Sequence, residues 1–82
     1  MEVRVFYHAF IKEKLGRESE LLFLSANSPR ASDVLNAFVT AHPEFALLSK
    51  SLSIAIDNEI MPRESAIGRN SRVDLFPPFG GG

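Results

Sequence analysis

Every second position near the start of the chain is β-branched or aromatic, at Val3, Val5 and Tyr7. This period of two predicts a strand over residues 3–7. Short apolar runs bounded by polar residues predict further strands over residues 20–24, 52–56 and 72–76. Asp57 and Asn58 form a turn signal that leads into a short strand at residues 60–61.

Apolar residues at spacings of three and four predict a main helix from Ala31, which ends at His42 because Pro43 follows. Residues 9–15 predict a short helix that Gly16 stops. A further apolar segment contains Phe45, Leu47 and Leu48, and its conformation is left open. Residues 62–71 are polar and predict a loop.

This order of elements predicts an α+β fold, in which a mixed sheet of four to five strands carries one main helix across one face. The first and last strands can be neighbours although they are far apart in the sequence. A β-grasp fold satisfies this order. We expect the folded domain to span residues 1–76.

Side-chain alternation predicts a surface patch on the sheet. If Val3, Val5 and Tyr7 face the main helix, then Phe6 and His8 point to the opposite side, and Phe76 does the same in the last strand. Such a patch, leading toward Phe79, is typical of a partner surface. The alternative is that the apolar segment around Phe45 covers it.

The amino-acid composition excludes several classes of partner and of binding site. Lys and Arg number nine against ten Asp and Glu, which gives a net charge of −1 without a basic block, so we expect no nucleic-acid partner. The chain has no cysteine, which excludes a disulfide framework and a thiolate metal site. We find neither a signal-peptide pattern nor a membrane-spanning run, and we expect a cytoplasmic protein with no membrane partner.

No arrangement of side chains predicts catalysis. His8 and His42 do not have metal-ligand spacing, and we expect no metal and no bound cofactor. The carboxylates are expected on the solvated surface; they are Glu18, Glu20, Asp57, Glu59 and Asp74. The terminal glycines lack the strand, helix and Lys-Ser or Lys-Thr that a phosphate loop requires.

The chain ends FPPFGGG, and this end is the most unusual part of the sequence. Pro77 and Pro78 cannot continue a strand ladder, and glycine favours flexibility, so we expect residues 77–82 to be a flexible tail. An extended glycine tail fits a narrow channel that any side chain would block. The Gly82 carboxylate is a poor electrophile until nucleotidyl transfer from ATP converts its oxygen into a leaving group, after which a sulfur or nitrogen nucleophile can displace it.

Five segments together resemble the small, sulfur-carrier subunit of molybdopterin synthase, in the MoaD and ThiS family of ubiquitin-like β-grasp proteins. They are VRVFYHA, KEKLGRES, DVLNAFVTAHPEF, SIAIDNE and VDLFPPFGGG, and they span nearly the whole chain. The Pro-Pro pair and the length favour the molybdopterin carrier over the thiamine carrier. Two sites depart from the family pattern: His8, where a large apolar residue is common, and the Phe79–Gly80 pair.

The resemblance implies a cycle centred on Gly82. An ATP-dependent activating enzyme adenylates the terminal glycine, a sulfur donor converts it to a thiocarboxylate, and the large synthase subunit uses the sulfur to build molybdopterin. The tail residues Pro77, Pro78, Phe79, Gly80 and Gly81 insert into the partner. Phe6, His8, Ile60 and Phe76 contact the large subunit, which supplies the catalytic side chains.

Two other functions stay open on the sequence alone. The chain can be a ubiquitin-like modifier conjugated through Gly82 to lysines, or an interaction domain in which the tail plays no part. A sulfur carrier for another biosynthesis is a variant of the first interpretation.

Overall fold

The computed structural model describes residues 1–78. Its elements follow one another as β1 (Glu2–Tyr7), α1 (Ala9–Leu15), β2 (Ser19–Phe23), α2 (Ala31–Ala41), η1 (Pro43–Ser51), β3 (Ser53–Ile56), β4 (Glu59–Ile60) and β5 (Val73–Phe76). The predicted strands and helices are therefore confirmed, with strand ends that differ by about one residue. The segment around Phe45, whose conformation the sequence left open, is a 3-10 helix.

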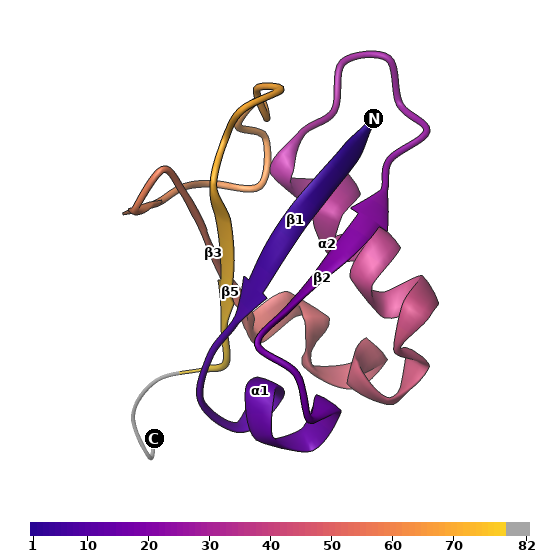
Figure 1. Cartoon of the computed structure of the whole chain (residues 1–82), viewed down its shortest axis with the longest axis vertical. Helices are drawn as coiled ribbons and strands as arrows, with labels where there is room; N and C mark the ends of the chain where they lie inside the picture. The colour runs from indigo at the N-terminus through magenta and orange to yellow at the C-terminus, as the bar shows by residue number, and fades with distance from the viewer. Residues whose placement is uncertain (79–82) are drawn as a thin grey trace.

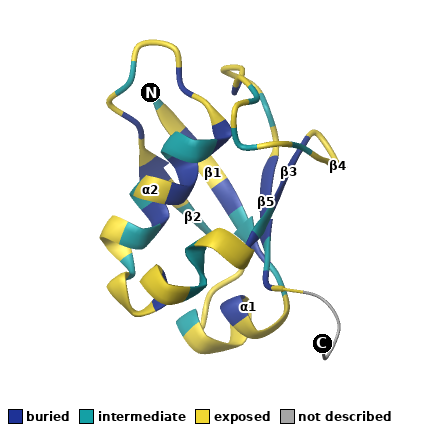
Figure 2. Ribbon diagram, turned by 180° about the vertical axis from the view of Figure 1, so that it is seen from behind, coloured by how far each residue is buried: buried dark blue, intermediate teal, exposed yellow. Residues whose placement is uncertain are grey.

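The five strands form one mixed sheet in the order β2-β1-β5-β3-β4. β1 pairs antiparallel with β2 and parallel with β5, so the first and last strands are neighbours as predicted. In Figure 1 the sheet lies in front of α2, and in Figure 2 α2 and η1 lie in front of the sheet. Both helices therefore cover the same face. Within residues 1–78 no helix covers the other face, which we call the open face.

The core lies between the sheet and α2. Val5 and Val73 from the sheet and Val34 and Phe38 from α2 have no solvent-exposed area. These α2 residues recur at spacings of three and four, because that spacing places them on one side of the helix. α2 ends at Ala41 because the residue before Pro43 is disfavoured in helical conformation.

The alternative in which the segment around Phe45 covers the predicted patch is wrong, because Phe45 lies on the other side of the sheet. Its ring is buried against the ring of Phe38, with centroids 5.1 Å apart, on the α2 side of the sheet. Leu47 of the same segment is 98% exposed and covers nothing. η1 therefore closes the end of the core on the α2 side and does not cover the open face.

Two turns use left-handed backbone. Gly16 has a φ of 68° and ends α1, and its N–H donates to the Lys12 carbonyl. Asp57 and Asn58 have φ values of 53° and 71°, which suits the tight hairpin between β3 and β4.

No helix within residues 1–78 is long and apolar enough to cross a membrane.

Candidate functional site

The open face of the sheet carries the predicted patch. Phe6 of β1 is the register partner of Asp74 of β5, so the two side chains lie side by side on adjacent strands. Val5 and Tyr7 point into the core, and the alternation turns Phe6 outward. His8 follows β1 directly and lies at the end of the sheet where β5 also ends, because the two strands run parallel.

His8 and Phe76 are in direct contact. Their rings are stacked, with centroids 4.4 Å apart and planes 11° from parallel. The Nε2 atom of His8 also lies 2.9 Å from Oδ1 of Asp74. A carboxylate only accepts hydrogen bonds, so Nε2 is the donor in this contact. The imidazole is thus held on its face by Phe76 and on its edge by Asp74.

Arg72 forms the other half of the cluster. Its Nε and one terminal nitrogen donate to the two oxygens of Asp74, each at 3.1 Å. The guanidinium carbon lies 4.0 Å from the centre of the Phe6 ring, a cation–π distance. The Asp74 carboxylate is therefore the centre of one cluster of side chains. They come from β1, from β5, and from the residues directly after β1 and directly before β5.

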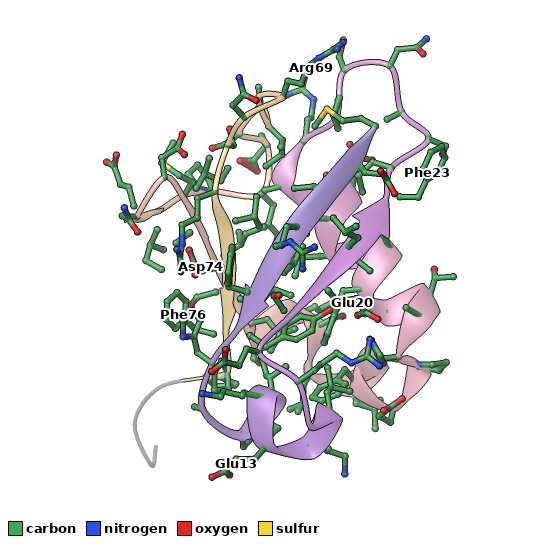
Figure 3. The ribbon with its side chains drawn as sticks, in the orientation of Figure 1. Glu13, Glu20, Phe23, Arg69, Asp74 and Phe76 are labelled. Carbon is green, nitrogen blue, oxygen red and sulfur yellow. The ribbon has the colours of Figure 1, made fainter. Side chains whose placement is uncertain are left out.

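Asp74 is buried, with only 5% of its side chain exposed. Burial works to raise its pKa, but hydrogen bonds from Arg72 and His8, together with their positive charges, outweigh burial and hold the pKa below its usual value. The carboxylate therefore stays charged at neutral pH. In Figure 3 Asp74 and Phe76 lie next to each other along β5 on the same side of the sheet.

The cluster borders a shallow depression of about 270 Å³. Ile60, which is 58% exposed, lies at this depression together with His8 and Phe76. Ala55 of β3 is buried beneath it. The structure thus brings together Ile60, His8 and Phe76, with Phe6 next to them under Arg72. Their contact with a partner stays a prediction.

The predicted tail begins at this depression. Pro77 follows Phe76 and is buried, and Pro78 is exposed. Phe79, Gly80, Gly81 and Gly82 lie outside the described residues, so their predicted roles stay predictions.

Two carboxylates contradict the expectation of a solvated surface. Asp74 is one, and its ion-pair partner is Arg72, two residues before it on the same face. Glu20 is the other: its side chain is 16% exposed and accepts hydrogen bonds from Tyr7 and from Nε2 of His42, the latter at 2.7 Å. A polar residue within an apolar strand can be identified as buried and paired only once the neighbouring strand is known.

The Glu20 cluster lies on the helix side and joins β1, β2 and the end of α2. Burial works to raise the pKa of Glu20, but the hydrogen bonds from Tyr7 and His42 and the nearby charges of His42 and Arg17 lower it. Burial, more than the contact with Glu20, raises the pKa of the Tyr7 hydroxyl. Every group here is satisfied within the fold, so the cluster is structural.

A metal site is not formed by the described part of the chain. Within residues 1–78 no group of three or more His, Cys, Asp and Glu side chains is arranged to hold a metal ion. The open face offers ring stacking, apolar contact and the Arg72 guanidinium, which are means of binding a protein surface.

Comparisons with known proteins agree with this description. The model of the ThiS family matches residues 5–82. SAMP1 from Haloferax volcanii is 23% identical, with a TM-score of 0.78 and 100% of both chains covered. The putative molybdopterin converting factor subunit 1 from Pyrococcus furiosus is 20% identical, with a TM-score of 0.81, and 96% of this chain and 99% of that chain are covered.

A third solved structure contains two proteins. It is the complex of subunits 1 and 2 of the molybdopterin-converting factor from Helicobacter pylori 26695, in which the matching chain is 19% identical, with a TM-score of 0.66 and 100% of both chains covered. No curated protein matches the chain. These likenesses confirm the predicted α+β, ubiquitin-like β-grasp fold.

Proposed function

The chain belongs to the ThiS family, and on this basis we propose that it is a sulfur carrier that works through the carboxylate of Gly82 as the small subunit of molybdopterin synthase. The observation that supports this most is the position of the open face. A cluster of Phe6, His8 and Phe76 lies where β5 ends and the terminal segment begins. A partner that holds this face also receives the chain end.

The proposed chemistry is carried by the chain end and by other proteins. A carboxylate oxygen of Gly82 attacks the α-phosphorus of ATP on an activating enzyme, and pyrophosphate leaves. Hydrosulfide, HS⁻, released by a sulfur donor, then attacks the carbonyl carbon of the adenylate. AMP leaves with the bonding electron pair, and the chain end becomes a thiocarboxylate.

The partner in sulfur delivery is the large subunit of the synthase, which would supply the catalytic side chains. The Helicobacter pylori structure is a complex of two such subunits, and its subunit 1 has the same fold as this chain. We place this cycle in the cytoplasm, in line with a sequence free of cysteine.

Intact-mass spectrometry tests the carrier step. The protein is incubated with ATP, a sulfide source and the activating enzyme, and we expect a gain equal to one oxygen-to-sulfur exchange. A variant without Gly82 is the control and should gain nothing. An unchanged mass, with no adenylate detected, would contradict the proposal.

A second candidate is supported by the likeness to a small archaeal modifier protein, which has the same fold over the whole chain. In that case the activated Gly82 carbonyl is attacked by a lysine amine instead of a sulfur. Tryptic digests of cells that express the chain would then contain lysines bearing its C-terminal residues. Sulfur carriage without such adducts favours the first candidate.

A further inference from the structure

β2 is an edge strand with unused main-chain groups. The N–H and C=O of Leu24 both bond to Met1, and the N–H of Tyr7 donates to the Glu18 carbonyl. Hydrogen-bonded and non-bonded pairs alternate in an antiparallel ladder. The main-chain groups of Ser19, Leu21 and Phe23 therefore point away from β1, toward the edge where the described part of the sheet has no further strand.

A groove runs along this edge, between β2 and α2. Its volume is about 610 Å³. On the sheet side its apolar lining is Leu22 and Leu24. On the helix side the small side chains Ala37 and Ala41 line it together with the polar residues Asp33, Asn36 and Thr40. Small residues at these α2 positions leave room for side chains that enter from outside the sheet.

The opposite side of β2 is also apolar. Leu21 is 50% exposed and Phe23 is 71% exposed, and both lie on the open face (Figure 3 labels Phe23 at the outer end of β2). An added strand places alternate side chains on the two sides of the sheet. One set would enter the groove, and the other would cover Leu21 and Phe23.

The charged residues at the groove indicate which residues of a partner should flank the added strand. The charged side chains that line it are both acidic, Glu20 and Asp33, and no Lys or Arg among the described residues lines it. Glu20 is balanced by Arg17 and His42. Asp33 accepts the N–H of Arg30 and has no cation in contact within residues 1–78, so it leaves a negative charge at the groove.

We propose that the β2 edge is a docking site for an extended segment of another protein, a short run of β-branched residues flanked by lysine or arginine. The segment adds a strand to the sheet through the main chain of Ser19, Leu21 and Phe23. The site is separate from the cluster around Asp74 and does not depend on the proposed sulfur chemistry.

A titration of the full chain by two-dimensional NMR tests this proposal. The probe is a peptide of five alternating valines and isoleucines with two lysines at each end. We expect saturable shifts, below about 1 mM peptide, at residues 19–24 and 36–41. The amides of Leu21 and Phe23 should also gain protection from hydrogen exchange.

Two altered peptides and one variant sharpen the test. Methylation of every main-chain amide of the valine and isoleucine residues blocks both edges of the peptide and should abolish binding. Glutamates in place of the lysines should weaken binding at low salt, with the difference reduced at high salt. Ala37→Leu should fill the groove and reduce affinity for the peptide at least tenfold. Leu47→Ala should not, because Leu47 is exposed on η1 and does not line the groove. The methylated peptide keeps the test valid if Ala37→Leu fails to fold.

Several outcomes would overturn the proposal. They are no saturable shift, shifts confined to the β4 edge or the Asp74 cluster, equal binding of the methylated peptide, or equal binding of the glutamate-flanked peptide at low salt. Shifts of residues 19–24 that depend on protein concentration without peptide would instead assign the edge to a second copy of this chain.

Discussion

The imidazole of His8 lies flat against the ring of Phe76, 4.4 Å away between centroids, while its Nε2 donates to the buried carboxylate of Asp74. His8, which directly follows β1, thereby contacts both Asp74 and Phe76 of β5. The stack fixes the direction of the Phe76 side chain at the point where the chain leaves the sheet. If the partner binds this face, as proposed, His8 serves both the stability of the fold and the contact with the partner.

Two substitutions of His8 should separate these roles. His8→Ala removes both contacts and should weaken binding to the large synthase subunit about tenfold. His8→Phe keeps a ring against Phe76 and should retain most of the binding, but it removes one donor from buried Asp74 and should cost about 1 kcal/mol of unfolding free energy. Calorimetry measures the binding and urea unfolding the stability. Wild-type affinity of His8→Ala would argue against a role for the stack.

The apolar residues at the depression should carry most of the partner affinity. Phe76→Ala and Ile60→Ala each should weaken binding to the large subunit by about tenfold to a hundredfold, because they remove side chains that a partner would bury. Leu47→Ala is the matched control, since Leu47 is also exposed but lies on η1. An equal loss in the control, or none in the first two, would move the partner surface elsewhere.

Acid should destabilise the fold through Asp74 and Glu20. Both have a lowered pKa in the folded state, so their stabilisation is complete above their unfolded pKa values of about 4 and is lost as the pH falls through the folded values. The urea midpoint should stay level from about pH 7 to 5 and fall below about pH 4. Glu20→Gln should lower the plateau and flatten the fall, whereas Glu59→Gln, on the exposed β4, should do neither.

Ala9 offers a stabilising substitution. It has a φ of 54°, a left-handed conformation that costs a residue with a Cβ roughly 1–2 kcal/mol. Ala9→Gly should therefore raise the unfolding free energy, by up to about 1 kcal/mol once the greater freedom of the unfolded chain is counted. Ala46→Gly in η1 is the control and should lower it. A loss of stability in Ala9→Gly would show that the backbone there is not strained.

Local sequence patterns predict most of the helices and strands. They do not predict which residues are buried by contacts formed in the tertiary structure. The alternation of Val3, Val5 and Tyr7 and the spacing in α2 predict both elements and the side of the sheet on which Phe6 lies. The apolar run at residues 20–24 predicts the strand correctly, but it does not reveal that Leu21 and Phe23 of β2 are exposed while Leu22 is buried. β2 is an edge strand and nothing within residues 1–78 covers the open face, which local sequence does not reveal.

The buried carboxylates escaped prediction for a related reason. Asp74 sits between Val73 and Leu75, and the alternation alone indicates an exposed polar residue. It is buried because β1 brings His8 beside it, across 66 positions of sequence. Glu20 likewise depends on His42, which reaches it only after α2 has packed on the sheet.

Single-turnover sulfur transfer tests the central claim most directly. The chain, prepared with a thiocarboxylate at Gly82, is mixed with the large synthase subunit and the pterin precursor, and both protein mass and product are followed. The account predicts that two thiocarboxylates revert to carboxylates for each dithiolene that forms, and that Phe76→Ala slows both changes together. A thiocarboxylate that persists beside the complete partner, with no dithiolene formed, would contradict it.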